Sequence, residues 1–423
     1  MNKPTINRNP WSFIPTLYFA EGVPYVIINT VSVILYKRMG IDNATIAFWT
    51  SWLYLPWVIK MFWGPIVDTY STKRNWIILT QMAMMCCFGL IAISIYLPSF
   101  FLISLFGFII GAFISATHDI AADGFYLISL NKEQQAYFVG IRTTFYRLSM
   151  IFGSGFLVFL AGYFEKSLNN IPQSWSIVMG ISGIIFGLIC IYHKIIFPYP
   201  LEDRKKSKEE LENKISFIEA FSSYFKQDKI LIILLFILLY RFGESLLIKL
   251  AAPFLLDKRS LGGLEMATSD VGLIYGTIGV ISLIIGSIIG GWSISKYTLK
   301  KCILPMALIL NLPNIAYLYL SYIQPTNIYI IGSLVSLEQF GYGFGFTAYT
   351  VYLMYISRGE YKTSHFAIST GIMALGMMIP GFVSGWIQQI IGYQMFFWVV
   401  LAMGIPGILT LFFIPLDLEE KMI

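Results

Sequence analysis

The sequence is poor in charge, in cysteine and in histidine. Charged residues make up 12% of its 423 residues, whereas a soluble globular domain usually carries about 25%, so the composition excludes an ordinary soluble domain. It has no CxxC pair and no group of neighbouring metal ligands, which excludes a disulfide framework and a zinc site. No nucleophile lies beside a base, so we expect neither an enzyme nor a bound cofactor. The four cysteines all lie in apolar stretches: Cys86, Cys87, Cys190 and Cys302.

Long apolar stretches are the feature that the sequence has in abundance. Apolar residues make up 57% of the chain, and about 20 consecutive apolar residues cross a hydrocarbon core of roughly 30 Å. The sequence therefore predicts an all-α membrane protein with twelve transmembrane helices. The first span is too long for a signal peptide, so we expect it to be retained. The predicted spans are 11–36, 45–66, 76–97, 100–127, 138–162, 175–197, 229–256, 270–294, 302–322, 327–356, 363–391 and 394–415.

The basic residues are distributed unevenly between the loops. The formal net charge of +6 could indicate nucleic-acid binding, but the positions of the basic residues along the chain favour a different explanation. With both termini cytoplasmic, 20 of the 29 lysines and arginines fall on the cytoplasmic side and five on the opposite side. This excess fits the positive-inside rule and predicts the orientation. Membrane topology accounts for the basic balance, and we expect no nucleic-acid partner.

One long connection divides the twelve spans into two sets of six. We predict an N-terminal six-helix half at 1–197, a cytoplasmic linker at 198–228 and a C-terminal six-helix half at 229–423. The linker is rich in Lys and Glu, which is typical of a solvated connection, with a regulatory site as the alternative. Short basic turns occur at corresponding places in the two halves. Such a repeat is typical of transporters that bind substrate near the middle of the membrane.

Glycines recur along three predicted spans. Those of spans eight and eleven follow roughly helical spacing and form smooth ridges, which allow helix backbones to approach closely. We interpret these ridges as packing surfaces, with motion as a further role. In span ten, Gly341, Gly343 and Gly345 alternate with aromatic residues. Each glycine weakens a helix by about 1 kcal/mol relative to alanine, so we expect a bend there.

Ionisable residues lie inside the predicted spans, where they are costly. A charge at the centre of the bilayer costs about 2.5 to 3.5 kcal/mol on insertion scales, so such residues face the protein interior and indicate functional sites. Five of these residues are acidic and four are basic, which makes nearly complete pairing arithmetically feasible. They are Glu21, Lys60, Asp119, Asp123, Arg147, Arg241, Glu244, Lys249 and Glu338.

Two carboxylates in the stretch "SATHDIAADGFYLISL" are the strongest candidates for binding a coupling ion. Asp119 and Asp123 are four residues apart and share one helical face. Repulsion and burial would favour protonation of one of them, as a proton symporter requires. The structural alternative is that one or both pair with Arg147 of span five. The two interpretations overlap, because a salt bridge that protonation breaks is itself a switch.

The other intramembrane charges are candidates for substrate binding and gating. The fork of Arg147 suits a carboxylate or sugar hydroxyls. Arg241 and Glu244 are three residues apart, and Lys249 lies on broadly the same side of the span. Glu338 is a second candidate for the coupling proton. The remaining candidates are Glu21, Tyr146 and Tyr342 for the substrate, and Lys60, Asp68, Lys73 and Arg74 for a gate.

Several motifs, taken in order, resemble one known family. The segments "YFAEGVPY", "WTSWLYLPWVIKMFWGPIVDTY", "THDIAADGF", "YRLSMIFGSG", "LYRFGES" and "LEQFGYGFGFTAYTVYL" are similar to the muropeptide permease (AmpG-like) family of the major facilitator superfamily. The resemblance covers nearly the whole chain. Glu21, where a small residue is expected, and Arg241 with Glu244, in place of a Lys and Asp pair, depart from the family pattern.

The resemblance implies a function. It implies a major facilitator fold and a proton-driven importer of anhydro-muropeptides across the bacterial inner membrane, used in cell-wall recycling. The alternative is a transporter of oligosaccharides or another small solute, coupled to protons or sodium. We expect a multi-pass monomer whose partners are a small-molecule substrate, protons and the lipid bilayer.

Overall fold

The computed structural model describes residues 8–64, 67, 70–203, 217–357 and 361–416. In this part of the chain the structure is helical and contains no β-strand. Nine of the described helices are long and apolar enough to cross a membrane. One of them contains two predicted spans, because α20 (Lys362–Thr410) breaks at Gly392, whose φ of 74° is left-handed. Predicted span two is formed by two shorter helices, α3 (Asn43–Trp52) and α4 (Leu55–Ile59), and span ten by α19 (Ile328–Ile356). The all-α fold with twelve membrane helices is thus confirmed.

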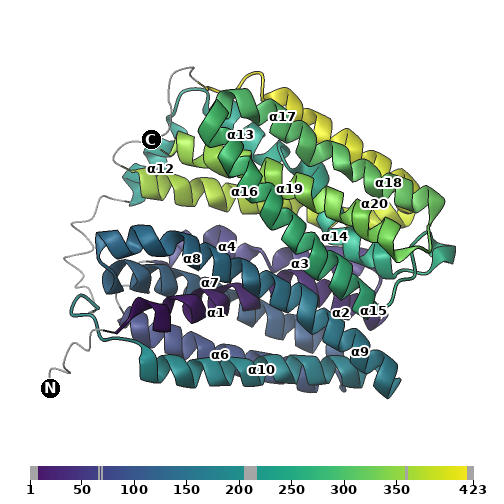
Figure 1. The fold of residues 1–423 in the computed structure, drawn as a ribbon, viewed down its shortest axis with the longest axis horizontal. Helices are drawn as coiled ribbons and strands as arrows, with labels where there is room; N and C mark the ends of the chain where they lie inside the picture. The colour runs from purple at the N-terminus through teal and green to yellow at the C-terminus, as the bar shows by residue number, and fades with distance from the viewer. Residues whose placement is uncertain (1–7, 65–66, 68–69, 204–216, 358–360, 417–423) are drawn as a thin grey trace. The chain divides into compact units, whose positions relative to one another are not determined.

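The first six predicted spans correspond to the helices that precede the linker (Figure 1). Several of these spans contain a π-helical or 3-10 turn, and each such span therefore consists of more than one α-helix. The helices are α1 (Ile14–Val26), α2 (Ser32–Arg38), α3 (Asn43–Trp52), α4 (Leu55–Ile59), α6 (Lys73–Ser94), α7 (Phe100–Ser129), α8 (Lys132–Met150), α9 (Val158–Leu168) and α10 (Ile171–Ile196).

The remaining helices follow in the second part of the chain (Figure 1). A short helix, α12 (Phe217–Phe225), precedes span seven, and span seven itself is divided into α13 and α14. The helices are α13 (Ile230–Leu239), α14 (Phe242–Leu256), α15 (Thr268–Val271), α16 (Val280–Tyr297), α17 (Leu299–Asn311), α18 (Ile315–Ile323), α19 (Ile328–Ile356) and α20.

Residue contacts divide the chain into two compact units whose boundary differs from the sequence boundary. Unit 1 comprises residues 1–35 and 59–214, and unit 2 comprises residues 36–58 and 215–423. The segment 36–58, which includes α3, therefore packs with the later helices, chiefly with α20. A side chain at Gly385 of α20 would overlap the backbone of Asn43, so a glycine is required at this approach. At both of its ends, the segment 36–58 is covalently continuous with residues of unit 1.

Within unit 1, α6 packs against both α7 and α10, and α1 packs against α7 and α8. Gly22 permits the approach of α1 to α8, because a Cβ atom at this position would overlap Ser149 and lie 3.1 Å from the carbonyl oxygen of Tyr146. This contact places residue 21 of α1 next to α8. Glu21 is thereby brought next to the helix that carries Tyr146 and Arg147.

Within unit 2, α19 runs as one helix through the glycine-rich segment, so the predicted bend in span ten is wrong. A Cβ atom at Gly343 would overlap the carbonyl oxygen of Leu283 on α16. A Cβ atom at Gly286 of α16 would in turn overlap the carbonyl oxygen of Phe340. The glycines are needed for close helix packing, which offsets their low helix propensity. The interpretation of the span-eight glycines as a packing ridge is confirmed.

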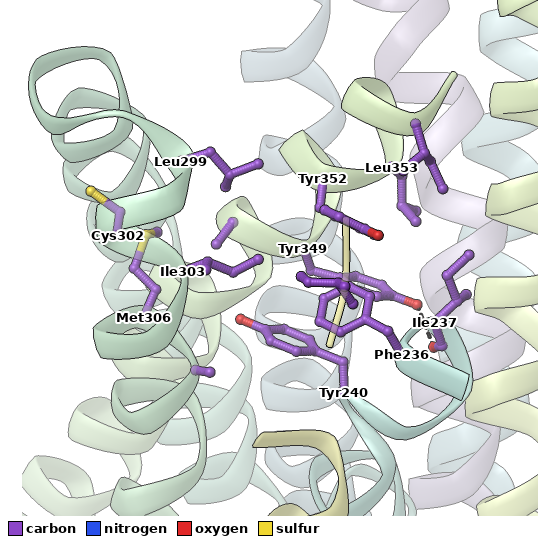
Figure 2. Packing of buried hydrophobic residues seen from close by; sticks show 14 of the residues in the cluster. Phe236, Ile237, Tyr240, Leu299, Cys302, Ile303, Met306, Tyr349, Tyr352 and Leu353 are labelled. Carbon is purple, nitrogen blue, oxygen red and sulfur yellow. Dashed lines mark hydrogen bonds between the residues drawn. The ribbon is translucent and has the colours of Figure 1, made fainter. Parts of the chain in front are cut away.

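Span seven of unit 2 is broken at Tyr240 and Arg241, which lie between the end of α13 at Leu239 and the start of α14 at Phe242. Tyr240 anchors this break because its hydroxyl donates to the carbonyl oxygen of Gly345, 3.0 Å away. Its ring stacks on that of Tyr349 with centroids 5.1 Å apart. Figure 2 shows these rings in the buried core together with Phe236 and Tyr352, and the hydrogen bond from Tyr349 to the carbonyl oxygen of Ile237.

Candidate functional site

The two aspartates of α7 both form ion pairs inside unit 1. Asp119 lies 3.7 Å from the Nζ atom of Lys60. Asp123 lies 3.3 Å from a guanidinium nitrogen of Arg142 and accepts a hydrogen bond of 3.0 Å from the Tyr18 hydroxyl. Tyr18 in turn accepts a hydrogen bond from Arg142 at 3.0 Å. Each carboxylate thus has a cationic partner on another segment, so a proton on either one would weaken a contact between segments.

Arg142 is a residue of this site that the sequence interpretation missed. It lies inside α8, and its guanidinium is 4.9 Å from the centre of the Tyr18 ring. No local spacing connects it to Asp123, because the two residues lie on different helices. The signal that could have identified it is its position five residues before Arg147, within the predicted span.

Glu21 and Tyr146 lie close to these aspartates, and Arg147 follows Tyr146 in α8. Glu21 is within electrostatic range of Asp119 and Asp123, and Tyr146 of Asp119 and Glu21. The Oε2 atom of Glu21 is buried and has no hydrogen-bond partner in the part of the chain that the structure describes. An unsatisfied carboxylate oxygen can accept a hydrogen bond from a hydroxyl, an amide or a proton carrier. The structure therefore brings Glu21, Tyr146 and the two aspartates together within unit 1.

The predicted gate residues fall at two places. Lys60 belongs to the aspartate cluster described above, whereas Lys73 and Arg74 begin α6. The carboxylate of Asp203 accepts the backbone N–H groups of both, at 2.6 and 3.0 Å. The Arg74 side chain donates to the carbonyl oxygen of Lys194 at 2.6 Å. The start of α6 is thus tied to the segment after α10, and Asp68 lies outside the described residues.

The second cluster of predicted residues lies at the break in span seven of unit 2. Arg241 donates to Glu244 at 2.8 Å and to the Tyr342 hydroxyl at 2.9 Å, so the predicted pair with Glu244 is present. The Arg241 guanidinium also lies 4.6 Å from the centre of the Phe346 ring. The Oε1 atom of Glu244 is buried without a hydrogen-bond partner among the residues that the structure describes.

Glu338 is a buried carboxylate in α19 of unit 2. It is 2% exposed and accepts a hydrogen bond of 3.0 Å from Gln339. Within the described residues it has no cationic partner. A carboxylate in such surroundings is costly when charged, and protonation removes that cost.

A chain of buried polar side chains crosses four helices of unit 1 next to the aspartates. Gln81 of α6 lies 3.1 Å from the Nε2 atom of His118 and 2.8 Å from the Nδ1 atom of His193. The other ring nitrogen of His193 lies 2.9 Å from the Thr16 hydroxyl. Because Gln81 joins α7 to α10, we interpret this chain as a structural connection that orients α7.

A polar cluster that the sequence did not reveal lies at the end of span seven that is remote from the linker. We call Lys37, Asn43, Asp257, Gln388 and Tyr393 the Asp257 cluster. Asp257 lies 2.5 Å from the Nζ atom of Lys37 and accepts hydrogen bonds from Tyr393 at 2.7 Å and from Asn43 at 3.2 Å. Asn43 also donates to Gln388 at 2.8 Å. The cluster joins the segment 36–58 to the end of α14 and to α20.

The comparison with protein families agrees with this architecture. The model of the Major Facilitator Superfamily matches residues 16–363. The chain belongs to the major facilitator superfamily. It is therefore a multi-pass membrane transporter of this superfamily.

A curated relative indicates a branch of the superfamily to which this chain is similar. The anhydromuropeptide permease of Escherichia coli is 25% identical over 403 residues, which cover 93% of this chain and 77% of the relative. The resemblance to the muropeptide permease family, which was first inferred from the motifs, is thus supported over nearly the whole length.

Solved structures support the fold. The nucleoside transporter NupG superposes with a TM-score of 0.71 at 12% identity and covers 94% of this chain and 98% of its own. A D-xylose–proton symporter superposes with a TM-score of 0.70 at 13% identity and covers 96% and 97%. At these identities the likeness shows the major facilitator fold alone.

Proposed function

We propose that this transporter imports anhydro-muropeptides or related amino-sugar conjugates across the bacterial inner membrane, driven by the proton gradient. The name of the curated relative supports the cargo. The positive-inside distribution of Lys and Arg supports cytoplasmic termini. Import by alternating access then requires a proton site, a substrate site and gates that open in turn.

The observation that carries proton coupling is the burial of Glu338 without a cationic partner among the described residues. The Glu338 carboxylate is 2% exposed and, among the described residues, accepts a hydrogen bond from Gln339, so it becomes neutral when it takes up a proton. Asp119 and Asp123 differ from Glu338 because each has a cationic partner, Lys60 for Asp119 and Arg142 for Asp123. In this proposal Glu338 loads the proton, and the two aspartates exchange a cation for a proton as the protein changes state.

The substrate contacts follow from the unsatisfied polar atoms of the two clusters. Glu21 and Glu244 each carry a buried carboxylate oxygen without a hydrogen-bond partner in the described structure. Such oxygens suit the hydroxyl and amide groups of an amino sugar. Arg241 and Tyr342 supply donors and an aromatic face beside Glu244. Tyr146 of α8 lies near Glu21.

The Asp257 cluster has the properties of a gate at the extracytoplasmic end. It holds the segment 36–58 against α14 and α20 by a buried ion pair and by amide and hydroxyl groups. This segment is continuous with α1 of unit 1 and packs with unit 2. Opening of that end would require the separation of these contacts. Lys73 and Arg74, at the start of α6, are the corresponding candidates at the cytoplasmic end.

Uptake into membrane vesicles tests the proposal. Vesicles that contain the transporter receive an imposed inward proton gradient and either labelled anhydro-muropeptide or a plain oligosaccharide of similar size. We expect muropeptide accumulation that a protonophore abolishes and that sodium does not replace. Accumulation of the oligosaccharide alone would be consistent with a transporter but would contradict the proposal that its cargo is a muropeptide. Accumulation that follows a sodium gradient would contradict proton coupling.

A further inference from the structure

One basic side chain in unit 2 is buried without a counter-charge in the described structure. Lys249, in the middle of α14, is 2% exposed. Its Nζ atom donates to the Thr50 hydroxyl at 3.1 Å and lies 4.8 Å from the centre of the Tyr54 ring. No carboxylate of the described residues forms an ion pair with it. A buried ammonium without an anionic partner is a costly arrangement for a protein to retain for packing alone.

The hydrogen-bonding capacity of this ammonium is largely unused. A lysine ammonium has three N–H donors, and the Thr50 hydroxyl accepts one of them. Thr50 itself donates to the carbonyl oxygen of Ile46 at 2.7 Å, so it offers the ammonium only a lone pair. The Tyr54 ring adds a cation–π contact, which does not neutralise the charge. Two N–H donors of Lys249 therefore remain for a ligand.

Arg241 provides a direct contrast on the same span. Its guanidinium is neutralised by Glu244 and also donates to Tyr342. Of these two basic residues of span seven, only Lys249 has no carboxylate partner among the residues that the structure describes. Gly381 of α20 packs closely on the lysine stem, because a Cβ atom there would overlap the Ser51 hydroxyl and lie 3.3 Å from the Cε atom of Lys249.

We propose that Lys249 binds a carboxylate of the transported molecule, so that an acidic group is what unit 2 recognises in its cargo. This inference rests on the proposed function and specifies the class of substrate. A carboxylate matches the site because its single negative charge neutralises one ammonium, and its two oxygens accept the two free N–H donors. A phosphate dianion would leave an excess negative charge buried, which is unfavourable.

Ligand-induced thermal stabilisation of the purified protein tests this inference without any transport step. The probes are N-acetylmuramic acid, which carries a carboxylate, and its methyl ester, which differs only in lacking that charge. A ligand that binds the folded state raises the unfolding temperature. We expect the acid to raise it more than the ester does, and we expect this preference to disappear in Lys249→Gln. Lys249→Arg retains the charge and should retain a preference for the acid.

Lys296→Gln is the matched control, because Lys296 is exposed and contacts only Trp292 and Tyr297 among the described side chains. It should keep the preference of the wild-type protein. Equal stabilisation of the wild-type protein by acid and ester, or a preference that persists in Lys249→Gln, would overturn the inference. A carboxylate preference in protein that shows no gradient-driven uptake would instead retain Lys249 as an acid-binding residue and contradict the proposed function.

Discussion

Individual side chains in this transporter are held by contacts between helices that are far apart in the sequence. Gln81 is fully buried and reaches both His118 and His193, so one amide connects α6 to α7 and α10. Hydrogen bonds between membrane helices contribute about 0.6 kcal/mol on average and up to about 2 kcal/mol. This single side chain is therefore a substantial part of the polar contact in the interior of unit 1.

Gln81→Leu tests this contribution. We expect the free energy of unfolding to fall by about 1 to 2 kcal/mol, because both histidines lose a partner in a buried place. The measurement is thermal unfolding in detergent, followed by tryptophan fluorescence. Gln173→Leu is the control, since Gln173 is exposed at the start of α10, and it should leave stability nearly unchanged. An equal loss in both variants would show that Gln81 has no special role.

Asp42, at the start of α3, gives a prediction about pH. Burial raises the pKa of Asp42, but hydrogen bonds from Thr45 and Gln389 outweigh burial and hold the pKa below its ordinary value of 3.8. A lowered carboxyl pKa contributes stability that is complete above the ordinary value and is lost as the pH falls through the folded pKa. Asp42→Asn should remove this acid-side loss, which unfolding measured from pH 6 downward would show. An unchanged pH profile would contradict it.

At the scale of helices, the glycines of α16 determine how closely it packs on α19. Gly286→Ala should lower stability by about 1 to 3 kcal/mol, because the new methyl group would overlap the backbone of Phe340. Gly291→Ala in the same helix meets nothing within 4 Å and should be neutral or stabilise by up to about 1 kcal/mol. Thermal unfolding of the two variants distinguishes packing from helix propensity. A loss of similar size in both would favour a purely conformational role.

The Asp257 cluster is an element-scale contact that a double-mutant cycle can measure. Lys37→Gln and Asp257→Asn each remove one side of an ion pair of 2.5 Å. Because both then lose the same contact, we expect the double variant to be less destabilised than the sum, with a coupling of about 0.5 to 3 kcal/mol. Asp257→Asn combined with Lys296→Gln should be additive. Additivity in both pairs would exclude a stabilising role for the ion pair.

The sequence predicted the helices better than the contacts between them. Apolar length identified all twelve spans, and the break at Gly392 falls between the last two. The glycines of span ten were misread as a bend, because the same residues that weaken a helix also permit close packing, and only the neighbouring helix decides which effect wins. The real break at Arg241 carries neither proline nor glycine immediately before it.

The site was predicted at the level of residue types. Intramembrane charge indicated Glu338 and the two aspartates as candidates, because a charged residue within an apolar stretch is visible in the sequence. The partners Arg142 and Asp257 were missed, since both lie near predicted span ends where charge is ordinary. Pairing across helices depends on the helix positions, which a local pattern does not contain.

At the scale of the whole molecule, we propose that Glu338 in unit 2 carries the coupling proton, while Asp119 and Asp123 in unit 1 exchange a cationic partner for a proton as the protein changes state. Glu338 has Gln339 as its hydrogen-bond donor, whereas Asp119 and Asp123 have the cations Lys60 and Arg142. A transporter of this kind accumulates substrate only when a proton is released after each transport step. Replacement of Glu338 by an amide imitates the protonated state permanently.

The most direct test compares two modes of transport in Glu338→Gln vesicles with labelled anhydro-muropeptide. In one, an inward proton gradient drives accumulation; in the other, internal unlabelled substrate exchanges for external label without a gradient. The account predicts that accumulation falls to the level of vesicles without a gradient while exchange continues, because exchange needs no proton release. Gradient-driven accumulation at the wild-type level in this variant would contradict the central claim that Glu338 carries the coupling proton.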